Sequence, residues 1–528
     1  MSKKAKVSVN PNFKIGEISK RLYGAFLEPI GTMVNGGMYN PAHPTADEQG
    51  FRKDWIDALK EFGIPAVRLP GGNFVSGWDW KDSIGPKDLR KKHLDLAWHQ
   101  YYTNDIGHDE YLQWTEKIGA EPMYTLNLGT GDINDAVYNV EYTNHEGGTY
   151  WSDLRKKNGH DKPYGVKMWY LGNEMDGPWQ VASWEKDPKA YGVKANEVSK
   201  AIKWVDGTIE TAVCVSSSPD VLHYPDWDEK VLRECYNSVD YVSLHMYQSA
   251  AIGNYAQFMA AARYYEDYIR TEIGLCDYIQ TLCRSPKKMM LSFDEYGTMF
   301  LPQQEIHFGR EVYIEPGTYY PQHNDREYIL HDPNNMGEMY SHRFGSPILS
   351  ALGNAGVLLE MLRHADRVKI ACMTGGLGTA ATTSAEGVYI TPGHYTYLDL
   401  LRYGQGVSLT PVVECEKFDV ASFAIDDNHK SPEQKDVDLI DCAAAFNEEK
   451  GELTVFVINR DWEEDAEFTL NVSELDGYRF DSHYEMFSED LESNDAAPVK
   501  NEETKADGTV VTAGLKKLSW NVFRFVKD

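Results

Sequence analysis

Eight short apolar runs, each rich in β-branched and aromatic residues, alternate along the chain with longer amphipathic stretches. The runs occupy residues 21–28, 65–72, 122–129, 166–174, 211–218, 239–247, 288–297 and 367–374. The stretches between them, such as 51–63 and 190–206, place apolar residues three and four positions apart, which is typical of a half-buried helix. Strands that alternate with helices favour a parallel sheet, and eight such units predict an α/β fold, the closed (β/α)8 TIM barrel.

The sequence pattern changes after residue 403, where strand-like runs alternate with turn signals. This pattern predicts a C-terminal β-sandwich domain over residues 404–528. Residues 1–18 also alternate and precede the first barrel strand, so we expect them to add an N-terminal strand to the sandwich. The catalytic barrel is then expected over residues 19–403.

The charge balance restricts the class of partner. Lys and Arg number 52 against 81 Asp and Glu, a formal charge of −29 that repels nucleic acid and anionic membrane surfaces. Aromatic residues make up 12% of the chain and suit either sugar stacking or core filling. The seven cysteines are scattered and form no CxxC pair, which favours reduced, buried thiols. With no apolar targeting segment at the start, these features predict a cytoplasmic protein with a neutral substrate.

Polar residues gather at the ends of the predicted strands, where a barrel builds its active site. They are Glu28, Arg68, Asn73, Asn127, Asn173, Glu174, His245, Tyr247, Asp294 and Glu295. Glu174 and Glu295 lie on the fourth and seventh predicted strands and would face each other across the barrel mouth. Hydrolysis of a glycosidic bond needs two such carboxylates, and their separation, which differs between retaining and inverting enzymes, is not fixed by sequence.

Several of these segments together resemble glycoside hydrolase family 51, chiefly α-L-arabinofuranosidases. They include VRLPGGNFVSGWDWKDSIGP, LNLGTGD, VKMWYLGNEMDGPWQ, DYVSLHMY and LSFDEYG, and the match spans nearly the whole chain. The resemblance implies a retaining mechanism with Glu174 as acid/base and Glu295 as nucleophile. It also implies that Asn173 binds the sugar 2-hydroxyl, and that a further set lines the pocket or orients the nucleophile: Glu28, Arg68, Asn73, His245 and Tyr247.

These implied roles agree with the chemistry of the side chains. Glu295 must be ionised to attack, and Arg68 or the Tyr247 hydroxyl would stabilise its carboxylate. Glu174 must begin protonated, and the negative charge of Glu295 favours that proton until the glycosyl-enzyme forms. One pair of carboxylates then serves both steps of a double displacement.

Other interpretations of the same residues remain open. The two glutamates can be structural ion-pair carboxylates, His245 a buried core histidine, Arg68 a tie between strand ends and Asn73 a turn residue. The segment GLGTAA at residues 376–381 mimics a dinucleotide fingerprint, but no helix clearly follows it. No HExxH, CxxC or EF-hand spacing occurs, so we predict neither a metal nor another cofactor.

Departures from the family affect the expected substrate more than the chemistry. Tyr296 and Gly297 stand where the family commonly has Trp and Asn, so we expect different pocket walls, and the run at 372–376 is expected to lose a substrate contact. A long segment, 301–345, should lie at the barrel mouth.

The leading hypothesis is an exo-acting α-L-arabinofuranosidase on arabinose-containing oligosaccharides from hemicellulose. The alternatives are another furanoside, a β-xyloside or a β-glucan as substrate, or a non-catalytic carbohydrate-binding protein. The resemblance also implies a homo-oligomer, with a hexamer as one candidate.

Overall fold

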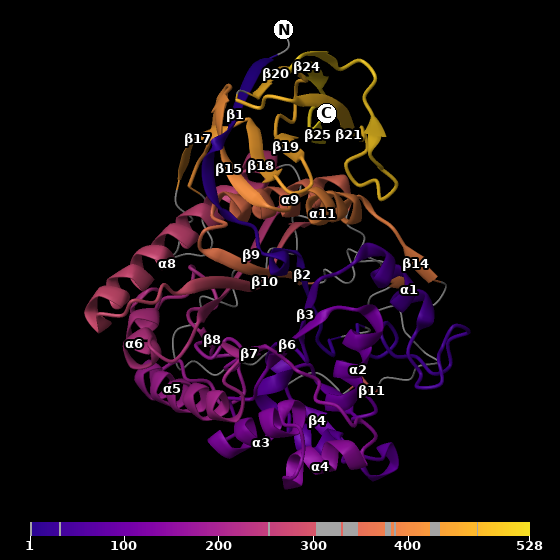
Figure 1. Cartoon of the computed structure of the whole chain (residues 1–528), viewed down its shortest axis with the longest axis vertical. Coiled ribbons are helices and arrows are strands. Elements are labelled where there is room, and N and C mark those ends of the chain that lie inside the picture. The colour runs from indigo at the N-terminus through magenta and orange to yellow at the C-terminus, as the bar shows by residue number, and fades with distance from the viewer. Residues whose placement is uncertain are drawn as a thin grey trace.

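The computed structural model describes residues 3–30, 33–251, 254–301, 329–330, 347–374, 382–384, 387–422, 433–472 and 474–527. The chain forms two parts, a helix-covered barrel and a sheet domain stacked on one end of it (Figure 1). The predictions for residues 376–381 and for Gly375 concern positions outside the described residues, as does most of the segment 301–345.

A closed barrel of eight strands forms the larger part, in the order β10-β12-β2-β3-β6-β7-β8-β9. Every neighbouring pair is parallel. Each predicted apolar run overlaps one of these strands, so the barrel prediction is confirmed. The strands are β2 (Gly24–Phe26), β3 (Ala66–Leu69), β6 (Glu121–Thr125), β7 (Met168–Tyr170), β8 (Glu210–Cys214), β9 (Tyr241–Ala251), β10 (Met290–Leu301) and β12 (Val368–Met373).

Side chains of the barrel strands alternate between two cores, as the twofold period of a strand requires. One set, which includes Phe26, Met123, Met168, Tyr170 and Ile370, fills the barrel interior. The alternate set packs outward against the helices. The interior is therefore packed, and chemistry is confined to the ends of the strands.

Helices cover the barrel between its strands (Figure 1). They are α1 (Lys53–Phe62), α2 (His108–Ile118), α3 (Ile133–Asn144), α4 (Tyr150–Lys157), α5 (Pro188–Val205), α6 (Asp226–Cys235), α7 (Tyr255–Met259), α8 (Ala261–Cys283), α9 (Ile348–Arg363) and α11 (Pro392–Tyr403). Helix α1 shows why the sequence forms them: it buries Trp55, Ile56, Leu59 and Phe62 along one face. It ends at Gly63, whose φ of 73° is left-handed.

The barrel part of the chain also contains several shorter elements. Single 3-10 turns span Lys20–Tyr23, Asn73–Gly77, Trp80–Ser83 and Lys87–Leu89, and small strands are β4 (His93–Asp95), β5 (Gln100–Tyr102), β11 (Ile329–Leu330), β13 (Thr382–Ser384) and β14 (Gly387–Tyr389). Strand β11 pairs with β5, so residues 329–330 of the long 301–345 segment lie beside the β4–β5 hairpin.

The second part is a ten-stranded sheet in the order β22-β21-β25-β19-β18-β15-β1-β20-β24-β23. Its strands are β1 (Lys3–Glu17), β15 (Val407–Glu414), β18 (Ile440–Asn447), β19 (Glu452–Asn459), β20 (Ala466–Val472), β21 (Tyr478–Met486), β22 (Val499–Lys500), β23 (Lys505–Asp507), β24 (Val510–Leu515) and β25 (Ser519–Lys527). A separate ribbon joins β16 (Lys417–Val420) to β17 (Gln434–Asp438). Strand β1 lies between β15 and β20, which places the N-terminal segment in this sheet.

The ten-stranded sheet folds back on itself. Phe468 of β20 and Phe523 of β25 pack with ring centroids 5.3 Å apart, although four strands separate β20 from β25 in the sheet. Both belong to one buried core. The two halves of the sheet therefore face each other as the layers of a sandwich, in agreement with the predicted C-terminal β domain.

Helices α9 and α11 lie between the barrel and the sheet domain (Figure 1). Arg363 of α9 pairs with Asp441 of β18 at 2.7 Å and with Glu360 at 2.6 Å. On α11, Asp399 accepts a 2.9 Å hydrogen bond from the Trp520 indole of β25. Buried polar contacts thus join the two parts.

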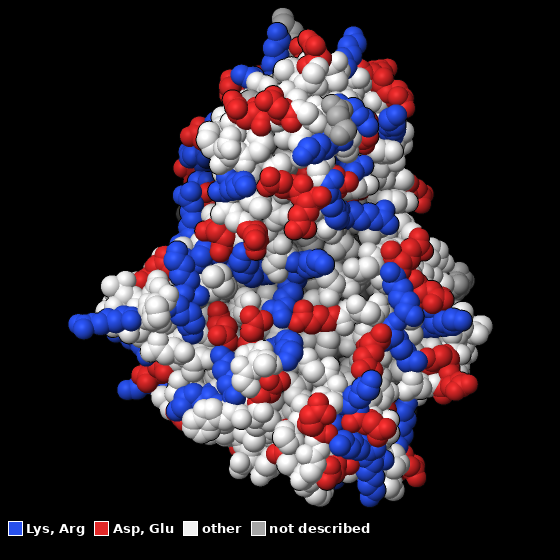
Figure 2. Space-filling view, in the orientation of Figure 1, with Lys and Arg blue, Asp and Glu red and all other residues white. Residues whose placement is uncertain are grey.

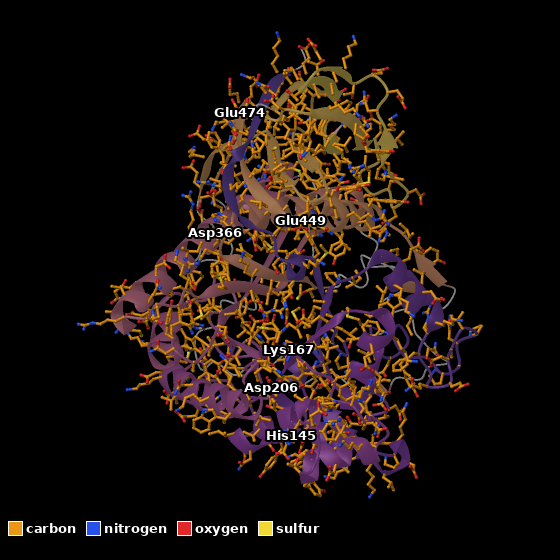
Figure 3. The ribbon with its side chains drawn as sticks, in the orientation of Figure 1. His145, Lys167, Asp206, Asp366, Glu449 and Glu474 are labelled. Atoms are coloured by element: carbon orange, nitrogen blue, oxygen red, sulfur yellow. The ribbon has the colours of Figure 1, made fainter. Side chains whose placement is uncertain are left out.

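The surface carries charges of both signs. Basic and acidic side chains are interspersed over the face seen in Figure 2, so basic groups do not form one large patch there. Figure 3 labels Lys167 and Asp206, whose Nζ and Oδ2 atoms lie 3.8 Å apart beside the amino end of β7. Contacts at that end of a barrel usually serve stability. None of the helices in the described ranges is long and apolar enough to cross a membrane.

Candidate active site

The residues predicted from the strand ends meet in one hydrogen-bonded cluster. Arg68, His245 and Tyr247 connect Asn173, Glu174 and Glu295, while Asn73 contacts Asn173, and Glu28 and Glu295 both lie close to Gly72. The cluster lies at the carboxyl ends of β2, β3 and β7 and along the middle of β9 and β10, which continue beyond it. Asn127 is the exception, because its side chain bonds Trp78 and Thr130 in a turn.

Glu295 is held by donors on both oxygens. Arg68 Nη1 donates to Oε1 at 2.8 Å, and the Tyr247 hydroxyl donates to Oε2 at 2.7 Å. The side chain of Glu295 is 9% exposed, so it reaches the mouth, while its partner Arg68 is fully buried. This arrangement suits a carboxylate that must stay ionised and point at one atom.

A β-bulge in β10 turns two consecutive carboxylates inward. Ser292 pairs with Ser243 and Glu295 with His245, so three steps along β10 match two along β9. Asp294 and Glu295 therefore both contact Arg68, where a regular strand would point one of them outward.

Asp294 is fully buried beneath Glu295. Its Oδ2 lies 3.0 Å from Arg68 Nε and 3.2 Å from His245 Nε2, and it accepts from the Ser243 hydroxyl at 2.9 Å. Burial alone would raise the pKa of Asp294, but the charges of Arg68 and His245 outweigh it and hold the pKa below its ordinary value. Asp294 is thus a buried anion that anchors both cations of the site.

Glu174 follows β7 in a left-handed backbone conformation, with φ of 44°. Its Oε1 lies 2.9 Å from His245 Nδ1, and its Oε2 accepts from the Trp179 indole at 2.5 Å. Burial raises the pKa of Glu174, and the charge of Glu295 adds to that, while the bonds from His245 and Trp179 oppose it. The net direction is upward, as a general acid requires.

His245 bridges the two sides of the site. Burial lowers its pKa, but the charges of Glu295 and Asp294 and the hydrogen bonds with Asp294 and Glu174 raise it to about 10. The ring is therefore an imidazolium at neutral pH, with one N–H toward Asp294 and the other toward Glu174.

An amide network lies on the β3 side. Asn173 Oδ1 accepts from Arg68 Nη2 at 2.7 Å, and Asn173 Nδ2 donates to Asn73 Oδ1 at 3.1 Å. Gln180 also donates to Asn73 Oδ1 and accepts from the Ser76 hydroxyl at 2.7 Å. These bonds fix the orientation of each amide at the mouth.

Glu28 lies at the end of β2 and is 3% exposed. Its Oε1 accepts from the Phe74 N–H at 2.9 Å and from the Trp98 indole at 2.8 Å. Burial, followed by the charge of Glu295, raises the pKa of Glu28 to about 8.

The carboxyl groups of Glu174 and Glu295, the two catalytic candidates, lie close together. One oxygen of Glu174, one of Glu295 and one ring nitrogen of His245 lie within 4.8 Å of one another. Retaining glycosidases keep their two carboxyl groups about 5–5.5 Å apart, and inverting ones about 6.5–9.5 Å. The spacing fits direct attack by one carboxylate.

Two donor sets in the described residues are close enough to hold a metal ion: Glu174, His245 and Glu295, and the set Glu266, Glu360 and His364. In the second set, Arg363 lies 2.6 Å from Glu360, and Arg270 lies 3.1 Å from Glu266. Both carboxylates already have cationic partners, so this set is an ion-pair cluster between α8 and α9.

Sequence reasoning missed several contributors. Trp179 and Gln180 lie within the quoted NEMDGPWQ motif, but nothing in the sequence shows that they fold back onto Glu174 and Asn73. Trp98 stands in an irregular loop, and Thr374 bonds the Tyr247 hydroxyl at 2.7 Å. Only their tertiary neighbours reveal these roles.

The expected change of pocket wall at Tyr296 is wrong. Tyr296 is fully buried in the core between barrel and helices, because the strand turns it away from the mouth. Gly297 does face the site, since a Cβ there would lie 3.7 Å from the Tyr247 ring. The departure at Gly297 therefore concerns the pocket, and the one at Tyr296 concerns packing.

Comparisons with known proteins agree along the whole chain. Residues 58–270 match the family described as Alpha-L-arabinofuranosidase 1 domain, and residues 294–519 match the Alpha-L-arabinofuranosidase C-terminal domain. The intracellular exo-α-(1→5)-L-arabinofuranosidase 1 of Bacillus subtilis is 37% identical, and its counterpart from Acetivibrio thermocellus is 36% identical. The alignments cover 100% and 99% of this chain and 100% of each relative. A solved family 51 α-L-arabinofuranosidase from Bifidobacterium longum superposes with a TM-score of 0.83 at 26% identity, covering 100% of both chains.

Proposed function

The chain belongs to glycoside hydrolase family 51, and from that premise we propose that it removes terminal arabinofuranosyl units from short α-(1→5)-linked arabino-oligosaccharides. It is a glycoside hydrolase of the α-L-arabinofuranosidase type. The α-(1→5) linkage is taken from the names of the two relatives. The observation that carries the mechanism is the 4.8 Å limit on the Glu174 and Glu295 oxygens, which suits double displacement.

In the first step, a Glu295 oxygen attacks the anomeric carbon while Glu174 gives its proton to the departing glycosidic oxygen. The carbon–oxygen bond to the leaving sugar breaks, and an ester bond to Glu295 forms. Arg68 and the Tyr247 hydroxyl hold the attacking carboxylate.

In the second step, Glu174, now ionised, takes a proton from water, and the water oxygen attacks the anomeric carbon. The ester bond breaks, Glu295 regains its charge, and arabinose leaves with its original configuration. We assign sugar binding to Glu28, Asn73 and Asn173, and the positioning of the two glutamates to Arg68, His245 and Tyr247.

A panel of aryl glycosides tests the substrate. Aryl α-L-arabinofuranoside should release its phenol, with the product anomer read by NMR at early times. Activity confined to an aryl β-xyloside, a β-glucan fragment or another furanoside would contradict the sugar assignment and leave the mechanism standing. Binding without any turnover would support a carbohydrate-binding protein.

Substitution of Glu295 tests the mechanism. Glu295→Gln should lower kcat at least about 10⁴-fold, because it removes the nucleophile. Glu197→Gln is the matched control, since Glu197 is an exposed glutamate paired with Lys200 on α5. If Glu295→Gln turns over substrate at the wild-type rate, the assignment is wrong.

Three further properties belong to the same proposal. We propose a barrel domain over 19–403 with 1–18 and 404–528 as the sandwich domain, an intracellular location like that named for the relatives, and a homo-oligomer, a hexamer being one candidate. Exposed apolar side chains support association: Trp204 is 83% exposed, Leu89 75% and Tyr150 73%. Light scattering on the eluting protein gives the number of copies.

A further inference from the structure

The candidate active site buries more negative groups than positive ones. Four carboxylates, those of Glu28, Glu174, Asp294 and Glu295, meet there. The cations that contact them within the described ranges are Arg68 and His245. Full ionisation would leave two uncompensated buried charges, which is costly in a low-dielectric interior. Two of the four carboxylates must therefore carry protons, and the general acid Glu174 accounts for one.

The two cations are shared by three of the carboxylates. Arg68 contacts Asp294 and Glu295, and His245 contacts Asp294, Glu174 and, at 3.8 Å, Glu295. Among the described ion pairs, neither cation reaches Glu28. Asp294 and Glu295 thus hold the compensated charges, which leaves Glu28 as the second protonated group.

The neighbours of Glu28 agree with this assignment. Its hydrogen-bond donors, the Phe74 N–H and the Trp98 indole, are neutral and both bind Oε1. The titratable groups that face it are Glu295 on β10, Asp95 on β4 and Tyr111 on α2, and the two acids both raise its pKa. Burial acts in the same direction and more strongly.

The second oxygen of Glu28 points toward the nucleophile. A Cβ placed on Gly72 would lie 3.1 Å from Glu28 Oε2 and 3.0 Å from Glu295 Oε1. Both carboxyl groups therefore lie close to the same backbone position. An ionised Glu28 would repel the charge that Glu295 needs for attack, whereas a protonated one would not.

We propose that Glu28 is a neutral carboxylic acid in the free enzyme and that its Oε2–H donates a hydrogen bond to a hydroxyl or ring oxygen of the sugar beside Glu295. The inference rests on the proposed glycosidase function and assigns the chemistry that Glu28 recognises: an acceptor oxygen. A donor role also makes sugar binding depend on pH. The donor is present well below pH 8 and is lost as the pH rises through about 8, the pKa of this group.

The variant Glu28→Gln tests whether Glu28 acts as a neutral hydrogen-bond donor or as an ionised carboxylate. The amide keeps an acceptor for Phe74 and Trp98 and an N–H in place of the O–H, but it does not titrate. At pH 6 we expect kcat/KM to fall only about three- to tenfold, while Glu28→Met, which has neither donor nor acceptor, falls at least about a hundredfold. Wild-type kcat/KM should also decline near pH 8 through a rise in KM, and that limb should vanish in Glu28→Gln.

An infrared difference spectrum gives a readout that does not depend on turnover. The wild-type minus Glu28→Gln spectrum should show the carbonyl stretch of a protonated carboxylic acid at pH 6 and lose it by pH 10. If that band is missing at pH 6, or if Glu28→Gln is as damaged as Glu28→Met while both melt at the wild-type temperature, the proposal is overturned. The kinetic assay uses whichever aryl glycoside the enzyme cleaves, so a wrong sugar assignment would not be mistaken for a wrong protonation state.

Discussion

At the scale of single residues, the site depends on a buried anion that lies one residue before the proposed nucleophile. Asp294 contacts Arg68 and His245, and these two cations in turn contact Glu295 and Glu174. The charges of Glu295 and Asp294 both raise the pKa of His245, so Asp294 helps to keep protonated a group that contacts both proposed catalytic glutamates. Asp294 acts through these partners, and we regard it as a positioning residue.

Asp294→Asn keeps the shape of this residue and removes its charge. The pKa of His245 should fall from about 10 into the assay range, because one of the charges that raise it is gone. Activity that needs the imidazolium would then decline as the pH rises through the lowered value, and kcat/KM at pH 7 should drop about a hundredfold. A pH–rate profile measures this new alkaline limb.

Ser243→Ala is the control for Asp294→Asn, since it removes a hydrogen bond from the same carboxylate and leaves the charge. The pH–rate profile of Ser243→Ala should keep the acidic and alkaline limbs of the wild-type profile. Identical limbs in Asp294→Asn and the wild type would show that Asp294 does not set the charge of His245.

At the scale of elements, the loop between β7 and α5 carries Glu174 together with Trp179 and Gln180, which contact Glu174 and Asn73. Asp176 anchors this loop to the end of β8. Its Oδ2 accepts from the Ser217 N–H at 3.0 Å and lies 2.9 Å from His223 Nε2. Burial lowers the pKa of His223, but the bond and charge of Asp176 raise it overall.

Asp176→Ala should loosen this loop without removing a reacting group. We expect kcat on an aryl glycoside to fall about tenfold, because Glu174 and Trp179 lose their fixed orientation. His223→Gln removes only the imidazole partner of Asp176 and should cost less. Limited proteolysis of the folded enzyme should cut the loop faster in Asp176→Ala, and wild-type kcat together with wild-type cleavage would refute the anchoring role.

At the scale of the whole molecule, the barrel and the sheet domain share a buried ionic contact. Arg363 of α9 reaches Asp441 of β18, and Asp441 also pairs with Arg460. The Arg363 side chain is 22% exposed and the Asp441 side chain is 3% exposed. Removal of one partner therefore leaves the charge of the other less compensated in a region with little water.

Arg363→Met should lower the free energy of unfolding by about 3 kcal/mol, since Glu360 and Asp441 each lose a cation. Urea denaturation followed by tryptophan fluorescence measures this. In a double-mutant cycle with Asp441→Asn, the coupling should reach about 1 kcal/mol or more. Arg402→Met, at an exposed position on α11, should change stability little. An unchanged urea midpoint for Arg363→Met would exclude a stabilising contact between the domains.

The sequence by itself determined the architecture and the identity of most residues at the site. Strand and helix periodicities are local, so eight βα units could be counted, and parallel strands necessarily bring their carboxyl ends to one face. That is why Glu28, Arg68, Asn173, Glu174, His245, Tyr247 and Glu295 could be placed together before any distance was known.

Only the tertiary structure decided what joins these residues. The bulge that turns Asp294 inward, the return of Trp179 and Gln180 to the mouth, and the burial of Tyr296 depend on strand register and long-range packing, which local patterns do not encode. Local patterns also do not encode protonation states, because the charge on Glu28 or His245 depends on groups that come from distant parts of the chain.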